Sequence, residues 1–176
     1  GYPIEQLAEH STYLETAYLL VFGELPTASQ LQTWEAAIHR HLTVPPWGKT
    51  LMDGFAVDAH PMGVFQSAIG ALSTYYPDSK DIFNVENRLL QIHRMIAKGA
   101  TFAAYTHRHA TRQPFVDPDA SLGFVGNFLA MLFRGEGPYA VDPVLVRALD
   151  VLFILHADHE QNCSTNAMRS IGSSHP

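Results

Sequence analysis

The sequence predicts an all-α fold, and three observations lead to that prediction. Apolar residues recur three and four positions apart in most segments, as they do on the buried face of a helix. Two capping boxes, Thr12-x-x-Glu15 and Thr27-x-x-Gln30, indicate where helices begin. No segment shows a sustained alternation of apolar and polar residues between hairpin turns, so strands are not expected.

Start and stop signals in the first half of the chain predict five helices. In order, they are a short helix around Ile4–Ala8, a helix from Thr12 to Gly23, a helix from Thr27 to about His41, a short helix after Pro45-Pro46, and a helix that begins at His60-Pro61 and ends near Tyr75. The last of these carries small residues at Gly63, Ser67, Gly70, Ala71 and Thr74. Such spacing allows a second helix to approach closely.

The second half is expected to contain a long helix that is capped by Asn84 and runs for about 28 residues to Gln113, with a length of roughly 42 Å at 1.5 Å per residue. A rod of this length, with Gly99-Ala100 at its centre, favours a multi-helix sandwich over a peripheral position. The triplet His107-Arg108-His109 near its end is interpreted as structural, because cations complement the carbonyl end of the helix dipole. The same reasoning applies to His39-Arg40-His41. A further helix is expected from Ser121 to Arg134.

The final predicted helix has Asp142 as N-cap and Pro143 at its first position, and should run to about residue 160. Its apolar face, Leu145, Leu149 and Leu152, continues into His156 and His159. The pair has three possible roles: a hydrogen-bonded boundary of the core, a metal site, or a site that binds an anion or polarises a carbonyl. Zinc requires three or four ligands, and with Cys163 as the one cysteine, no metal is expected.

Composition narrows the class of protein further. The 176 residues are 47% hydrophobic and 16% charged, which suits one globular domain with a substantial core. The net charge of -6 and the lack of a basic cluster argue against nucleic acid as a partner. No apolar run is long enough to span a membrane. The single cysteine fits a reducing compartment, so a cytoplasmic location is expected. Because the sequence starts at Gly1 and ends at Pro176, we expect an internal piece of a longer protein.

Motifs for other chemistries are missing from the sequence. There is no G-x-S-x-G nucleophile elbow, no G-x-G-x-x-G and no G-x-x-x-x-G-K-[ST]. No motif therefore indicates a serine hydrolase or a nucleotide-binding site. From residue patterns alone, the sequence predicts an all-α intracellular domain whose final helix ends in histidines.

Several segments, read in order, resemble the citrate synthase family, particularly its bacterial members. The most specific is Leu155–Asn162, LHADHEQN, which is similar to the family's H-[AS]-D-H-E block. Gly1–Ala8 resembles its G-[YF]-x-I-x-x-L segment, and Leu19–Thr27 resembles L-x-x-G-E-L-P-T. His60-Pro61-Met62 and Gly126–Leu129 resemble the family's H-P-M and N-F-L helix starts.

The resemblance implies the all-α large domain of a citrate synthase, without the small domain that closes over CoA. It implies condensation of oxaloacetate with acetyl-CoA, the latter as a substrate and with no further cofactor. His159 would contact oxaloacetate, Asn162 would be a further contact, and His156 would lie behind them or support them. The family's catalytic groups fall beyond Pro176, so no catalytic residue is expected within this chain and residues 1–176 alone should be inactive.

The resemblance also implies a homodimer through the helices near 61–75 and 85–112. Two alternatives stay open. One is 2-methylcitrate synthase, which has the same fold and uses propionyl-CoA, although Asp158 and Gln161 fit the citrate enzymes better. The other is a non-catalytic helical dimerisation domain.

Overall fold

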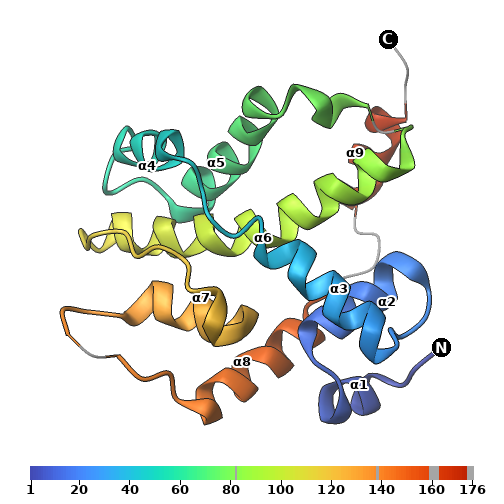
Figure 1. Ribbon diagram of the computed structural model, residues 1–176. Helices are drawn as coiled ribbons and strands as arrows, with labels where there is room; N and C mark the ends of the chain where they lie inside the picture. The colour runs from blue at the N-terminus through green and yellow to red at the C-terminus, as the bar shows by residue number, and fades with distance from the viewer. Residues whose placement is uncertain (82, 138, 159–162, 174–176) are drawn as a thin grey trace. The chain divides into compact units, whose positions relative to one another are not determined.

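Helices make up every regular element in residues 1–81, 83–137, 139–158 and 163–173, the part that the computed structural model describes (Figure 1). The predicted all-α fold is therefore confirmed. The chain divides into two compact units, one formed by Gly1–Leu25 with Ala148–Pro176 and the other by Pro26–Arg147. None of the described helices is long and apolar enough to cross a membrane.

The first unit contains α1 (Ile4–His10), α2 (Tyr13–Phe22), the last turns of α8 (Pro143–Leu155) and α9 (Cys163–Gly172). Its best-defined start is that of α2. The backbone amide of Thr12 donates to the Glu15 carboxylate at 2.7 Å, and the amide of Glu15 donates to the Thr12 hydroxyl at 3.3 Å. Gly23 ends α2 with a φ of 87°, a conformation that glycine adopts without strain. Both predicted signals are confirmed.

Helix α9 was not predicted from the sequence. All of its residues are exposed, and its two large apolar side chains, Met168 and Ile171, are 67% and 66% exposed. Within the described part of the chain, α9 therefore adds no buried residue to a core.

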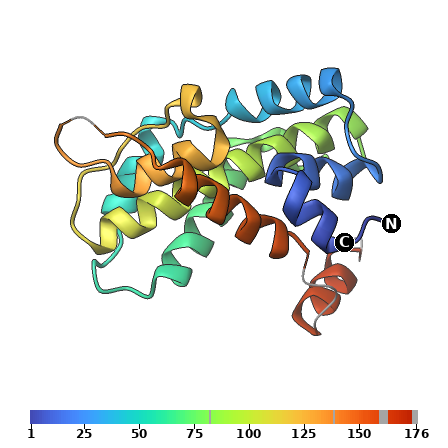
Figure 2. The same ribbon diagram turned by 90° about the horizontal axis from the view of Figure 1, so that it is seen from below.

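The second unit is organised around one long helix, α6 (Val85–Ala110). Helices α3 (Ala28–His39), α4 (Pro46–Asp53), α5 (Pro61–Tyr75) and α7 (Gly123–Phe133) all pack against α6, and α5 lies beside it in both views (Figures 1 and 2). One core cluster of this unit consists of Val44, Met52, Val64, Ala68, Leu72, Phe102 and Tyr105. A long helix at the centre of a multi-helix layer was the arrangement predicted for this segment.

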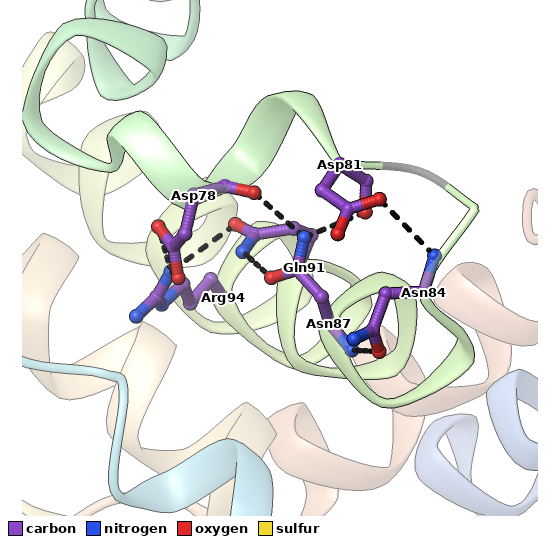
Figure 3. Close-up of polar contacts among 6 residues, drawn as sticks. All are labelled: Asp78, Asp81, Asn84, Asn87, Gln91 and Arg94. Carbon is purple, nitrogen blue, oxygen red and sulfur yellow. Dashed lines mark hydrogen bonds and ion pairs between the residues drawn. The ribbon is translucent and has the colours of Figure 1, made fainter.

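The start of α6 is held by a polar network that joins it to the short 3-10 helix η1 (Pro77–Lys80) (Figure 3). The Asn84 side chain accepts from the backbone amide of Asn87 at 3.0 Å, which makes Asn84 the N-cap, as predicted. The Asn87 amide group donates to the carbonyls of Asp78 and Asp81, and Arg94 pairs with the Asp78 carboxylate at 3.1 Å. The network fastens η1 to the first turns of α6.

Polar side chains on the buried face of α6 hold the segment that follows α3. The ammonium of Lys98, a residue that is only 2% exposed, donates to the carbonyls of His41 and Thr43, each at 2.8 Å. The Thr101 hydroxyl donates to the carbonyl of Leu42, also at 2.8 Å. Three consecutive carbonyls beyond the end of α3 are thereby satisfied, which buried backbone requires.

Several helix ends differ from their predicted positions. Helix α3 ends at His39 and not at His41, because the chain turns there toward Lys98 and Thr101. Helix α6 ends at Ala110, before Gln113, because Arg112 adopts a left-handed φ of 55° and the amide of Gln113 bonds back to Arg108. Helix α7 begins at Gly123, preceded by the 3-10 turn η2 (Ala120–Leu122).

Candidate functional site

The end of α8 is where the sequence predicts the site, and the structure corrects two features of that prediction. The helix ends at Leu155, before the predicted end near 160, so His156 lies in the turn that follows it. The buried residues of α8 are Asp150 and Ile154, whereas Leu145 and Leu152 of the predicted apolar face are 54% and 50% exposed. The other two predicted site residues, His159 and Asn162, lie outside the described residues.

The orientation of the His156 ring is set by the helix that it follows. Its backbone amide donates to the carbonyl of Leu152 at 3.1 Å, and its ring Nδ1 lies 2.8 Å from the same carbonyl oxygen. A carbonyl oxygen only accepts, so Nδ1 carries the hydrogen. In a neutral ring Nε2 is then an acceptor, and it becomes a donor toward an anion only when the ring is doubly protonated.

Upstream of His156, α8 is docked on the first turn of α2, within the first compact unit. The Asp150 carboxylate, in a residue that is 6% exposed, accepts from the backbone amide of Tyr13 at 2.9 Å. The rings of Tyr13 and Phe153 meet edge to face with centroids 5.4 Å apart, and Ile154 is 2% exposed. Burial raises the pKa of the Tyr13 phenol, in agreement with a ring held in an apolar contact. Sequence analysis did not single out Asp150, although an acidic residue within the apolar run LDVLFIL is itself a signal.

A second concentration of charge lies in the other unit, between the end of α3 and α6. Burial, together with the neighbouring Arg94 guanidinium, lowers the pKa of Lys98 to about 8. Burial also lowers the pKa of His41 and of His93, with the nearby cations acting in the same direction. Arg94 lies 4.0 Å from the centroid of the Tyr76 ring and pairs with Asp78. Because the Lys98 ammonium donates to backbone carbonyls and Arg94 pairs with Asp78, these two side chains hold the end of α3 and η1 on α6.

Arg108, the middle residue of the predicted structural triplet, is buried in the same unit with an exposure of 1%. Its guanidinium donates to the carbonyls of Pro114, Met131 and Arg134. The residue is structural, as predicted, but the physical reason is different. Instead of complementing the dipole of its own helix, Arg108 satisfies the carbonyl end of α7 and the chain after α6.

No group of three or more histidine, cysteine, aspartate or glutamate side chains lies close enough to hold a metal ion within the ranges that the structure covers. Cys163, at the first position of α9, is an exposed free thiol.

The second unit packs several helices around one long central helix, and the described elements of the first unit are helical too, so the chain falls in the class of all-α proteins. The family model of the citrate synthase C-terminal domain matches residues 1–176. The chain belongs to the citrate synthase family.

Individual relatives agree with this assignment. The chain is 50% identical over 175 residues to citrate synthase 1 of Mycobacterium tuberculosis, an alignment that covers 99% of this chain and 41% of the relative. The crystal structure of Pyrobaculum aerophilum citrate synthase matches with a TM-score of 0.83 at 32% identity, over 95% of this chain and 42% of that one. Citrate synthase from Thermoplasma acidophilum, in a ternary complex with carboxymethyl coenzyme A and oxaloacetate, has the same fold, with a TM-score of 0.83 at 21% identity over 95% of this chain and 42% of that one. This chain thus spans about two fifths of the length of these proteins.

Proposed function

We propose that the protein containing this chain is a citrate synthase that condenses oxaloacetate with acetyl-CoA and water, giving citrate and free CoA. The observation that carries the proposal is the 50% identity to citrate synthase 1 of Mycobacterium tuberculosis across nearly the whole of this chain. The oxaloacetate and carboxymethyl coenzyme A held by the Thermoplasma acidophilum enzyme support the same pair of substrates. In the reaction, the methyl carbon of acetyl-CoA loses a proton and bonds to the keto carbon of oxaloacetate. The keto oxygen becomes a hydroxyl, and water cleaves the thioester.

The contribution of this chain is to bind oxaloacetate. His159 and Asn162 supply the contacts and His156 supports them, as the H-A-D-H-E-Q-N segment implies by its resemblance to the family. An imidazole N–H directed at the keto acid stabilises negative charge on its oxygens. Catalytic groups and the CoA-closing domain come from the part of the protein outside residues 1–176, so these residues alone have no activity. The lone cysteine supports a cytoplasmic location, which stays a prediction.

The assay that tests this function measures release of the CoA thiol by the full-length protein with oxaloacetate and either acetyl-CoA or propionyl-CoA. We expect kcat/KM to be at least about tenfold higher with acetyl-CoA, because one additional methylene typically changes discrimination by 10- to 200-fold. Residues 1–176 alone should not exceed the buffer blank. A preference for propionyl-CoA would instead indicate 2-methylcitrate synthase, which the family assignment does not separate, and no release with either thioester would contradict the proposal.

The proposed oligomer is a homodimer formed through α5 and α6. Helix α5 has two different faces: Val64, Ala68 and Leu72 are buried in this chain, whereas Gly63, Ser67 and Gly70 are exposed. A Cβ added at Gly63, Gly70 or Gly99 would meet no other atom within 4 Å, so this surface is open to a second copy. Sedimentation equilibrium of the full-length protein should give the mass of two copies, and a monomer at micromolar concentration would contradict the dimer.

A further inference from the structure

Asp150 is a buried carboxylate on a helix face that is otherwise apolar, and the burial of apolar surface alone does not explain it. It is the buried charged residue of α8, on a face shared with Phe153 and Ile154, where an apolar residue would avoid the cost of removing a carboxylate from water. Its Oδ1 instead accepts the backbone amide of Tyr13, the first residue of α2, at 2.9 Å. A carboxylate that bonds a helix N-terminus is stabilised both by the hydrogen bond and by the positive end of the dipole.

The first turn of α2 has room for such an acceptor. The first amides of a helix have no partner within the helix. The Thr12 hydroxyl accepts a hydrogen bond from the backbone amide of Glu15, and the Glu15 carboxylate accepts one from the backbone amide of Thr12. The Tyr13 amide is not part of this capping box. Asp150, which is 137 residues away in the sequence, supplies its acceptor. The contact ties together two segments that belong to the same compact unit.

The face of α8 that docks on α2 lies next to the turn that carries His156. Asp150, Phe153 and Ile154 are spaced by three and one residues, so they share one side of the helix, and Phe153 meets the Tyr13 ring. Two residues after Ile154 comes His156, whose amide and ring both bond the carbonyl of Leu152 in that last turn. Any rotation of α8 about its axis would therefore move the turn that carries His156.

We propose that Asp150 is a positioning residue for the oxaloacetate site: by bonding the first amide of α2, it fixes the last turn of α8 and so the place of the turn that carries His156. The inference rests on the proposed function. Asp150 is not a catalytic residue, because it acts through the backbone of α2. A displacement of about 1 Å in a group that orients substrate can cost on the order of 100-fold in rate.

The test compares three variants of the full-length protein by steady-state kinetics. Asp150→Leu keeps the branching at Cγ and removes the acceptor, Asp150→Asn keeps the size and an acceptor oxygen and removes the charge, and Met52→Ala removes a buried side chain of the other unit as a control for stability alone. We expect Asp150→Leu to raise KM for oxaloacetate by about 10- to 100-fold, with KM for acetyl-CoA nearly unchanged. Asp150→Asn should recover most of the affinity, and Met52→Ala should lower the melting temperature without changing either KM.

A second pair of variants removes the donor. Tyr13 occupies the first position of α2, where proline is tolerated, and Thr12 before it has a ψ of 164°, which suits a residue that precedes proline. Tyr13→Pro and Tyr13→Ala both lose the ring, but only Tyr13→Pro loses the amide hydrogen. Tyr13→Pro should therefore raise KM for oxaloacetate well above the value for Tyr13→Ala, and this comparison replaces the first if Asp150→Leu does not fold.

The outcomes separate the two proposals. If the wild-type protein turns over and neither Asp150→Leu nor Tyr13→Pro shifts KM for oxaloacetate relative to its paired variant, the positioning role is overturned and the proposed function stands. If both substrates lose affinity equally, Asp150 is merely structural and the positioning role is also overturned. A wild-type protein with no turnover would overturn both.

Discussion

Replacing Arg108 with methionine is expected to lower the free energy of unfolding by about 3–5 kcal/mol, because three backbone carbonyls lose their donor together. Methionine approximates the stem of arginine and donates no hydrogen bond. The carbonyls of Pro114, Met131 and Arg134 would then lose the donor that the buried guanidinium provides. Each buried carbonyl left unsatisfied costs about 1–3 kcal/mol. Urea unfolding of the full-length protein, followed by tryptophan fluorescence, measures the change.

Arg112→Met is the matched control for Arg108→Met. Arg112 lies four residues further along and is exposed, and methionine keeps the same cost of a left-handed φ that arginine already has. Its effect should stay within about 0.5 kcal/mol, as for most surface substitutions. Equal losses in the two variants would show that the contacts of Arg108 with the end of α7 contribute no more to stability than a surface side chain does.

The second large effect is expected at His159. In the full-length protein, His159→Ala should lower kcat/KM for oxaloacetate by about 10²- to 10³-fold, the loss that follows removal of one hydrogen-bond donor to a reacting oxygen. The residue is chosen from the H-A-D-H-E-Q-N segment and its resemblance to the family. Initial rates at saturating acetyl-CoA and varied oxaloacetate measure the effect. His10→Gln, at an exposed position of α1, is the control, and a loss of equal size there would contradict a specific role for His159.

The parts of the fold that sequence predicted are those set by local chemistry. Thr12 and Thr27 begin α2 and α3 through complete capping boxes, and Asn84 begins α6 through its side chain. Gly23 ends α2 in the left-handed conformation that glycine favours. In each case the donor and the acceptor lie within four residues, so the pattern is visible in the sequence.

The parts that sequence could not predict depend on partners far along the chain. Lys98, Thr101 and Arg108 are buried because they satisfy carbonyls of residues 41–43 and 114–134, and a rule that places apolar residues inside assigns these polar residues to the surface. The face of α8 was misassigned for the same reason. The leucines at 145 and 152 follow helical spacing, but the face that docks on α2 is the one with Asp150.

The candidate site shows a similar division. The choice of His156, His159 and Asn162 came from the resemblance of a short segment, LHADHEQN, to the citrate synthase family. His156 is placed by the structure in the turn after α8, whereas His159 and Asn162 stay predictions. The contact that docks α8 joins Asp150 to Tyr13 across more than a hundred residues. Only the folded chain brings these two together.

The most direct test of the central claim, that this chain holds the oxaloacetate site of a citrate synthase, is an oxaloacetate titration of the full-length protein followed by its melting temperature. A ligand that binds only the folded protein stabilises it by about 2.7 kcal/mol at a hundredfold excess over its dissociation constant. The account predicts a clear rise in melting temperature for the wild-type protein and little or none for His159→Ala. An equal rise in both proteins, or no rise in either, would contradict it.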